Sequence, residues 1–379
     1  MSSTTKRRLP IGAEVVDGGG GVHFRVWAPK RDRLEVITAG RCASLTREPD
    51  GEGYFSGLVE SLRAGDRYKL RLDGAEAYPD PASRFQPDGP HGESQVIDPT
   101  GFKWTDRDWR GASPKGQILY EMHIGTYTPQ GTFAAAAEQL PELVDLGITL
   151  VEIMPVAEFP GRFGWGYDGV DLFAPYHMYG APDDFRALVD RAHREGIGVI
   201  LDVVYNHFGP DGSYLGQFAD AYVSTRHKTE WGPAVNFDGP DSRAVREFVL
   251  GNVRHWISEY HLDGLRLDAT HSIVDDSEPH ILEDIGAVAR EAAGGRQVVI
   301  IAESEPQDGR IVRPRDRGGR GLDQIWCDDF HHTALVAAHG KREAYFTDYR
   351  GSPQEFVSAL KHGILYQGQH YVFHKRRRG

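Results

Sequence analysis

The sequence predicts an incomplete (β/α) TIM-type barrel, with about six of the usual eight strands, preceded by a β-sandwich. From residue 115 onward, short continuous apolar runs alternate with amphipathic helical segments, a pattern typical of a parallel sheet with helices on both faces. Polar residues recur where the strands are expected to end, which is the active face of (β/α) barrels. An open doubly wound sheet is the alternative, but no Gly-rich turn after the first strand supports it.

The chain of 379 residues divides into three parts. Residues 1–90 carry short alternating runs separated by Gly- and Asp-rich turns, at the spacing of a β-sandwich. Residues 91–114 are expected to form a linker packed between domains, and residues 115–379 the partial catalytic barrel. The strands expected in the first part are 21–29, 33–40, 53–60 and 67–74.

In the barrel region, each helix is recognised by apolar residues that recur on one face. The first expected helix has Phe133, Ala137, Leu140 and Val144 on such a face, and Gly196 ends the second. The expected helices are 133–147, 183–196, 242–260 and 276–293, and the expected strands are 117–125, 148–156, 197–205, one within 261–273, 296–304 and 321–329.

Composition restricts the function and the compartment. The net charge of −12 argues against general nucleic-acid binding, which needs a basic surface. The only two cysteines, Cys42 and Cys327, lie far apart in the sequence, which is typical of a reducing compartment. Neither an apolar signal segment nor a long apolar run is present, so we expect a cytoplasmic protein without membrane contact.

Reactive side chains gather where four strands are expected to end. In the stretch HLDGLRLDATHSI, residues 261–273, Arg266 and Asp268 point to one side of the strand while its leucines point to the other. One acid at a strand end is explained by helix capping, but two acids beside an Arg and a His are not. The candidates, strand by strand, are Asp202, Asn206 and His207; Arg266 and Asp268; Glu303 and Glu305; and Asp328, Asp329, His331 and His332.

Two carboxyl groups that face one pocket indicate glycoside hydrolysis. Arg266 is expected to keep Asp268 ionised, as a nucleophile requires. Glu303 follows the apolar run VVIIA, where weak solvation would keep its proton in place and suit a general acid. In the loop WGYDGVD, Trp165 and Tyr167 are candidate platforms for sugar stacking, with core packing as the alternative.

Other chemistries have less support. The histidines His207, His331 and His332 occur without HExxH or Cys/His ligand spacing, so we expect no metal and no cofactor. Ser304 lies in no G-x-S-x-G turn, which argues against a serine hydrolase.

Several of these segments together resemble the alpha-amylase family of glycoside hydrolases. DVVYNH (202–207), DGLRLDATH (263–271) and IIAESE (300–305) are similar to three of the family's four catalytic-strand signatures, in the same order. FRVWAP (24–29) resembles the early-set immunoglobulin-like domain of branching and debranching members. The stretches most similar to the members that release trehalose are 80–92, 154–170, 267–273 and 328–332.

The resemblance implies hydrolysis, with retention, of the α-1,4 bond next to the trehalose end of malto-oligosyltrehalose. Asp268 would be the nucleophile and Glu303 the acid/base. Malto-oligosyltrehalose synthase would be the pathway partner, and α-glucan branching or debranching is the alternative within the family. The other implied residues are Tyr167, His207, Arg266, His271, Asp328, Asp329, His331 and His332 at the substrate, with Asp202 and Asn206 as structural neighbours.

One family signature is missing, because no strand after Glu303 ends in the His-Asp pair whose Asp stabilises the transition state in the family. We therefore expect a barrel that lacks two strands and has unpaired edges at its first and sixth strands. We also expect a truncated reading frame, with a product that is weak or inactive. A catalytically inactive glucan-binding fragment is the alternative of a different class.

Overall fold

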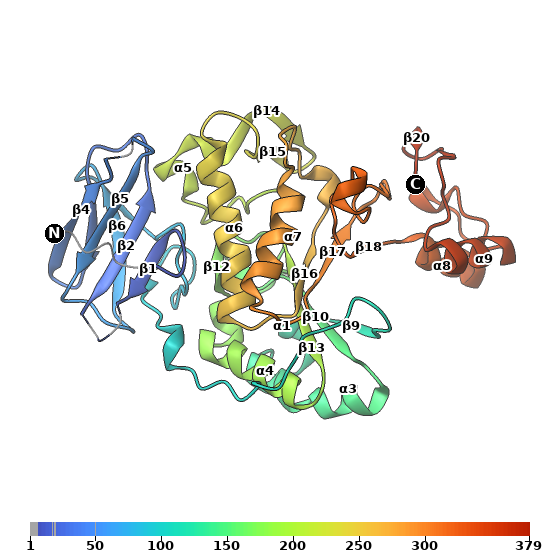
Figure 1. Ribbon diagram of the computed structural model, residues 1–379, viewed down its shortest axis with the longest axis horizontal. Coiled ribbons are helices and arrows are strands. Elements are labelled where there is room, and N and C mark those ends of the chain that lie inside the picture. The colour runs from blue at the N-terminus through green and yellow to red at the C-terminus, as the bar shows by residue number, and fades with distance from the viewer. Residues whose placement is uncertain (1–6, 17, 19, 50) are drawn as a thin grey trace.

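The computed structural model describes residues 7–16, 18, 20–49 and 51–379. An antiparallel sheet domain, a parallel sheet covered by helices and a small C-terminal lobe follow one another along the longest axis (Figure 1). The parallel sheet lies in the middle, between the other two parts.

The N-terminal domain is an antiparallel sheet in the order β1-β2-β5-β4-β3-β6-β7, with β8 paired to β6. All four strands expected from the alternating runs form. Strands β1, β4, β7 and β8 were not predicted. The side chains of β4 are mostly exposed and polar and carry no apolar alternation. The strands are β1 (Gly12–Val15), β2 (Val22–Trp27), β3 (Leu34–Thr38), β4 (Arg41–Arg47), β5 (Tyr54–Val59), β6 (Arg67–Leu72), β7 (Ala77–Tyr78) and β8 (Ser94–Gln95).

The second sheet has six parallel strands in the order β18-β17-β16-β13-β10-β9, so every strand pairs with its neighbours in chain order. This order confirms a partial TIM-type barrel. Within the described part of the chain, β9 and β18 each pair with one strand only, as expected for the first and sixth strands. The strands are β9 (Leu119–Met122), β10 (Leu150–Ile153), β13 (Gly198–Val203), β16 (Gly264–Leu267), β17 (Val299–Glu303) and β18 (Gln324–Trp326).

The connecting helices cover the sheet largely as predicted. In α4 (Pro182–Arg194) and α6 (Ser242–Glu259) the apolar stripes are buried. The helix expected over 133–147 is wrong as a single element. It is broken at Gln139 into α2 (Phe133–Glu138) and α3 (Leu140–Leu146).

Proline explains the break, since Pro141 fits the first turn of a new helix but not the interior of a long one. The restart changes the helical phase. Val144, expected on the buried face, is 39% exposed, and Leu143 is buried instead.

Short elements occupy the loops at the strand ends and were not predicted. The hairpin β14–β15 lies in the long connection between β13 and α6. The remaining unpredicted elements are α1 (Ile124–Tyr127), β11 (Ala157–Glu158), β12 (Asp171–Pro175), α5 (Leu215–Phe218), β14 (Val223–Thr229), β15 (Gly232–Val235) and the 3-10 turns Pro99–Gly101, His177–Tyr179, Asp220–Tyr222, Thr270–Ser272, Arg315–Arg317 and Ala344–Phe346. The helix expected over 276–293, by contrast, forms as α7 (Ile281–Ala292).

The C-terminal lobe has its own apolar cluster, formed by Val336, Tyr349, Tyr366 and Tyr371. It projects from the end of β18 (Figure 1) and contacts the loop after β17, where Glu305 pairs with Arg376. Its elements are α8 (Asp329–His339), α9 (Pro353–His362), β19 (His370–Tyr371) and β20 (Arg376–Arg377).

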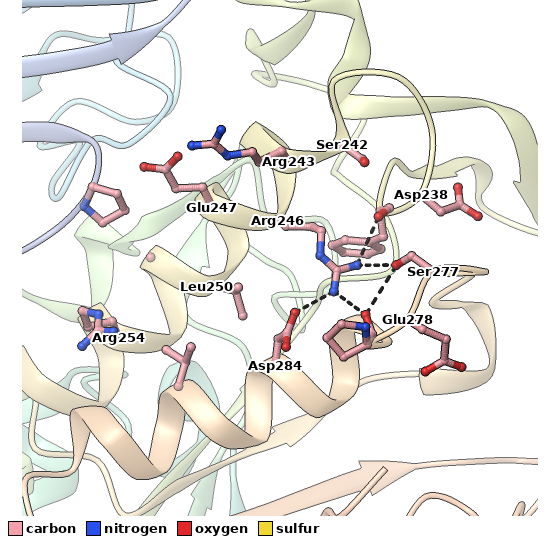
Figure 2. Close-up of a pocket in the computed structure, with 15 residues that line it drawn as sticks. Asp238, Ser242, Arg243, Arg246, Glu247, Leu250, Arg254, Ser277, Glu278 and Asp284 are labelled. Atoms are coloured by element: carbon pink, nitrogen blue, oxygen red, sulfur yellow. Dashed lines mark hydrogen bonds and ion pairs between the residues drawn. The ribbon is translucent and has the colours of Figure 1, made fainter. Parts of the chain in front are cut away.

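The N-terminal domain and the barrel meet at α6. Glu247 on this helix accepts hydrogen bonds from Arg25 at 3.0 Å and from Tyr54 at 2.8 Å. Next to this contact, a cavity of about 680 Å³ runs along α6 and α7 (Figure 2). The guanidinium of Arg246 inside it is bound by Asp284 and Ser277, so its charge is used within the protein. No helix in the described residues combines the length and apolar character that crossing a membrane requires.

A buried ion-pair network fixes the connecting segment to the amino-terminal end of the parallel sheet. The imidazole of His193 lies 2.9 Å from Asp106 through Nδ1 and 2.9 Å from Asp263 through Nε2. Trp109 stacks on this ring and donates to Asp263 at 2.8 Å. Because each ring nitrogen faces a carboxylate, the fold favours the doubly protonated, charged form of His193.

The free energy of unfolding should therefore fall as the pH rises through the pKa of His193. Burial alone would lower this pKa, but hydrogen bonds to Asp106 and Asp263 outweigh it and raise the pKa above 6.5. The stabilisation is complete below pH 6.5, where the unfolded chain is also protonated, and is lost above the folded-state pKa. It amounts to ~1.4 kcal/mol for each unit between the two pKa values. Urea unfolding of the parent and His193→Gln from pH 5 to 9 measures this, and a pH-independent difference between them would contradict it.

Candidate active site

The candidate site is built around Arg266, whose side chain is buried at the carboxyl end of β16. Strand β16 lies between β13 and β17, and its register sets Arg266 opposite Asp202 on one side and Ile301 on the other. Glu303 ends β17, one residue beyond the pair formed by Leu267 and Ala302. The parallel register therefore brings the predicted residues of three strands to one point.

The guanidinium of Arg266 binds both predicted catalytic carboxyl groups. Its Nη1 donates to Asp268 Oδ1 at 2.8 Å, and its Nη2 lies 3.1 Å from Glu303 Oε2. Nη1 also donates to both oxygens of Asp202, at 3.0 and 2.9 Å. Asp268 and Glu303 are thus held on neighbouring nitrogens of one planar group. This is the pair of carboxyl groups that the strand ends predicted.

Further contacts fix the orientation of the two carboxyl groups. Asn206 donates to Asp268 Oδ2 at 2.8 Å and to its backbone carbonyl at 3.0 Å. The backbone N–H of Ala269 donates to Glu303 Oε2 at 2.8 Å. Ala269 has φ of +40°, a left-handed conformation that is costly for a residue with a side chain and is found where function requires it.

Burial and neighbouring charges shift the pKa values of the groups around Arg266 by different amounts. Burial is the main cause that raises the pKa of Glu303, against the charge of Arg266, which lowers it. Burial also raises the pKa of Asp202 to about 7. Burial would lower the pKa of Arg266, but the charges of Asp202 and the other carboxyl groups outweigh it, and its pKa is raised. Glu303 is accordingly suited to hold a proton, as a general acid must.

The two predicted sugar contacts, Tyr167 and His207, lie against this cluster. Tyr167 donates its hydroxyl to Asp202 at 2.9 Å, and its backbone carbonyl lies 2.9 Å from His207 Nε2. The ring of His207 is stacked on Trp231, with ring centres 5.5 Å apart. Trp231 is half exposed and Trp165 is largely exposed.

Two residues of this region were missed by the sequence reasoning. Trp231 lies on the unpredicted β14–β15 hairpin. In the sequence it stands out only as an aromatic residue in a long connection that follows a catalytic strand. Glu152 in β10 is fully buried, with Oε1 3.9 Å from Arg266 Nε. Its signal was a single acid within the apolar strand run 148–156.

The other predicted residues lie elsewhere. His271 is exposed on the turn that follows β16. Asp329 is buried in the C-terminal lobe and accepts from Tyr349 at 2.7 Å, and His332 packs among the aromatic rings there. In the described part of the chain, none of the four residues at the start of α8 hydrogen-bonds Arg266, Asp268 or Glu303. These four are Asp328, Asp329, His331 and His332.

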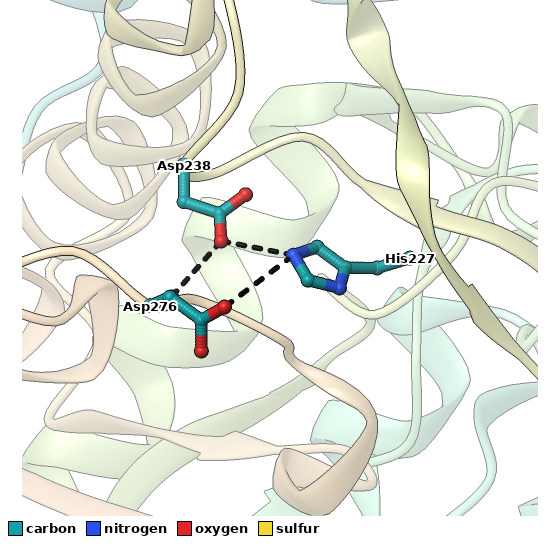
Figure 3. Close-up of side chains that lie close together, drawn as sticks. All are labelled: His227, Asp238 and Asp276. Atoms are coloured by element: carbon teal, nitrogen blue, oxygen red, sulfur yellow. Dashed lines mark hydrogen bonds and ion pairs between the residues drawn. The ribbon is translucent and has the colours of Figure 1, made fainter.

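One group of side chains has the spacing of a metal site. His227, Asp238 and Asp276 hold their ligand atoms within 4.8 Å of one another (Figure 3). His227 Nε2 lies 3.0 Å from Asp238, which also accepts the N–H of Asp276 at 3.0 Å. Arg226 lies 3.7 Å from both carboxylates. These contacts account for the cluster as an internal ion-pair network.

The chain is similar to several known proteins. The family model "Alpha amylase, catalytic domain" matches residues 96–232. The malto-oligosyltrehalose trehalohydrolase of Saccharolobus solfataricus is 44% identical over 95% of this chain and 63% of its own length. The enzyme of that name from Deinococcus radiodurans is 43% identical over 96% of this chain and 58% of its own length.

A solved structure is similar over nearly the whole chain. It is a crystal structure from Salmonella typhimurium described as a candidate alpha amylase, with a TM-score of 0.91 and 38% identity over 98% of this chain and 63% of that one. The chain thus spans about three fifths of the length of the relatives it matches.

Proposed function

The chain belongs to the alpha-amylase family, and from this premise we propose that it releases trehalose from malto-oligosyltrehalose by cleaving the adjacent α-1,4 bond. The observation that carries the proposal is the shared guanidinium of Arg266, which holds Asp268 and Glu303 together. Two carboxyl groups at one site, one of them with a raised pKa, are what glycoside hydrolysis requires. The similarity to trehalohydrolases supports the choice of substrate.

In this proposal Asp268 attacks the anomeric carbon of the malto-oligosyl unit while Glu303 gives its proton to the glycosidic oxygen, so that trehalose leaves. Glu303, now ionised, takes a proton from water, and that water cleaves the ester on Asp268. The configuration at the anomeric carbon is retained, and the two carboxyl groups are expected to lie ~5–5.5 Å apart.

The neighbouring residues would serve this chemistry. Arg266 and Asn206 orient Asp268, and Asp202 holds the guanidinium from the other side. Tyr167 and His207 would contact the sugar beside the scissile bond. The stacked pair of His207 and Trp231 offers a flat apolar surface for a sugar ring. Asp328 and His331 at the start of α8 would contact substrate on the far side of that bond, and His271 would also bind substrate. Asp329 and His332, expected at the same place, are instead buried in the C-terminal lobe.

The proposal also covers the source of the substrate, the compartment and the type of the N-terminal domain. Malto-oligosyltrehalose synthase would make the substrate, and both reactions would take place in the cytoplasm without a cofactor. The N-terminal antiparallel sheet would be an immunoglobulin-like domain of the early-set type.

The decisive experiment incubates the purified protein with maltotriosyltrehalose and separates the products. Free trehalose and maltotriose support the proposal. Parallel incubations with linear and with branched α-glucan test the alternative. Branched product from the first, or linear oligosaccharide from the second, would assign the chain to a branching or debranching activity instead. Binding of maltoheptaose without any hydrolysis would leave a glucan-binding role.

Removal of metal ions should leave trehalose release unchanged. The residues around Arg266 satisfy one another's charges, and the proposed chemistry needs only the two carboxyl groups. Activity before and after dialysis against EDTA checks this expectation. A loss that calcium restores would instead make the His227, Asp238 and Asp276 group (Figure 3) an ion site.

A further inference from the structure

Glu152 is a buried acid that the proposed mechanism does not use. It lies in the apolar strand β10, where the register sets it beside Ile200 of β13 and Glu121 of β9. Its side chain is completely buried, whereas Glu121 is exposed. Among the described residues, no donor lies within hydrogen-bonding distance of either oxygen of Glu152. A buried acid without hydrogen bonds is costly when ionised and calls for a physical explanation.

The charges at this point of the sheet do not balance if every acid is ionised. The single guanidinium of Arg266 faces Asp202, Asp268 and Glu303 through Nη1 and Nη2, at 2.8 to 3.1 Å. Its Nε faces Glu152 at 3.9 Å and has no hydrogen-bond acceptor in the described structure. One positive charge therefore stands against four buried or half-buried acids, and protons must remain on some of them.

The contacts show which acid can best hold a proton. Asp268 and Asp202 each accept hydrogen bonds from Arg266 and from a second donor, Asn206 or Tyr167. Glu303 accepts one from the backbone of Ala269. Each of these bonds stabilises an ionised carboxylate. The bond to Glu303 does not outweigh the burial that raises its pKa, and Glu152 has no such bond at all. Burial, followed by the charge of Asp202, raises the pKa of Glu152 to about 9, against the charge of Arg266.

We propose that Glu152 is a positioning residue that keeps its proton at neutral pH and so leaves the charge of Arg266 to Asp202, Asp268 and Glu303. An ionised Glu152 would attract the guanidinium from the Nε side and compete with the two reacting groups. Its effect on catalysis rests on the proposed function, but its protonation does not.

The protonation is tested by unfolding in urea between pH 5 and 9, comparing the parent with Glu152→Gln. The folded parent holds a proton that the unfolded chain releases near pH 4.5, so its stability falls with pH until the folded group also ionises. Glutamine keeps the shape without the proton. The folding equilibrium constant of Glu152→Gln should therefore rise relative to the parent by up to about tenfold for each pH unit.

The matched control is Glu343→Gln, the same substitution at an exposed side chain of the C-terminal lobe. Its difference from the parent should not change with pH in this range. A pH-independent difference for Glu152→Gln as well would show that Glu152 is ionised in the fold and would overturn the proposal. Should Glu152→Gln not fold, the infrared difference spectrum between the parent and Glu152→Leu at pH 8 tests the proton. A protonated Glu152 contributes a carboxylic-acid carbonyl band to this difference, whereas other buried acids with raised pKa values, such as Asp171 and Glu303, cancel. Absence of that band overturns the proposal.

The positioning role has a separate readout. In trehalose release, Glu152→Gln should keep KM and the neutral-pH rate within about twofold and should move the alkaline limit of activity upward by about one pH unit. An unchanged alkaline limit, with the stability result as expected, would overturn the positioning role alone. If the protein shows no hydrolysis at all, the proposed function fails while the unfolding and infrared tests still decide the proton on Glu152.

Discussion

Replacing Asp268 with Asn is expected to lower trehalose release at least about 1,000-fold, corresponding to ~4 kcal/mol of lost transition-state stabilisation. The amide cannot form the ester intermediate, and it removes the ionised group that Arg266 binds at 2.8 Å. The variant keeps the shape of the side chain and the contact with Asn206. Binding of maltoheptaose should therefore change by less than about tenfold, which calorimetry measures beside the product assay.

The matched control is Asp316→Asn, an exposed carboxyl group on the turn Arg315–Arg317. It should leave both rate and binding unchanged. Turnover of Asp268→Asn at the level of the parent would show that Asp268 is not the nucleophile, whatever the substrate of the protein.

Replacing Arg266 with Met should destabilise the fold by about 3–5 kcal/mol at neutral pH, the usual cost of removing one partner from a buried ion pair. Met fills the volume but leaves Asp202 and Asp268, both buried, without their common cation. Urea unfolding at pH 7 measures the loss. Trehalose release should be lost too, because Asp268 and Glu303 are no longer held together.

A second substitution separates charge from packing in this prediction. If unbalanced charge is the cause, Asp202→Asn in the Arg266→Met background should recover part of the lost stability, because it removes one uncompensated acid. No recovery would indicate that the loss came from packing. Arg266→Lys keeps the charge but not the planar fork, and should retain more stability than activity.

The site could be predicted in part because strand geometry is local. Alternation along a strand sets Arg266 and Asp268 on one side, and parallel strands bring their carboxyl ends to one edge of the sheet. The meeting of these strand ends depended also on the strand order, which follows the order along the chain.

Other features could not be predicted because they depend on the packing around them. The break between α2 and α3 follows from Pro141, whose effect the apolar spacing concealed. Trp231 reaches His207 through a hairpin that carries no regular apolar pattern. Asp329 and His332 lie in the C-terminal lobe, and Tyr349 and Tyr371 of that lobe have no periodic signal in the sequence.

The sequence by itself determined the alternation of strands and helices, the burial of α4 and α6, and the residue types that end each catalytic strand. Only the tertiary structure decided that one guanidinium serves three acids, and that Glu152 faces it without a hydrogen bond. The reason is physical. A strand or helix follows from neighbouring residues, whereas the charge balance of a buried site depends on distances between side chains that lie far apart along the chain.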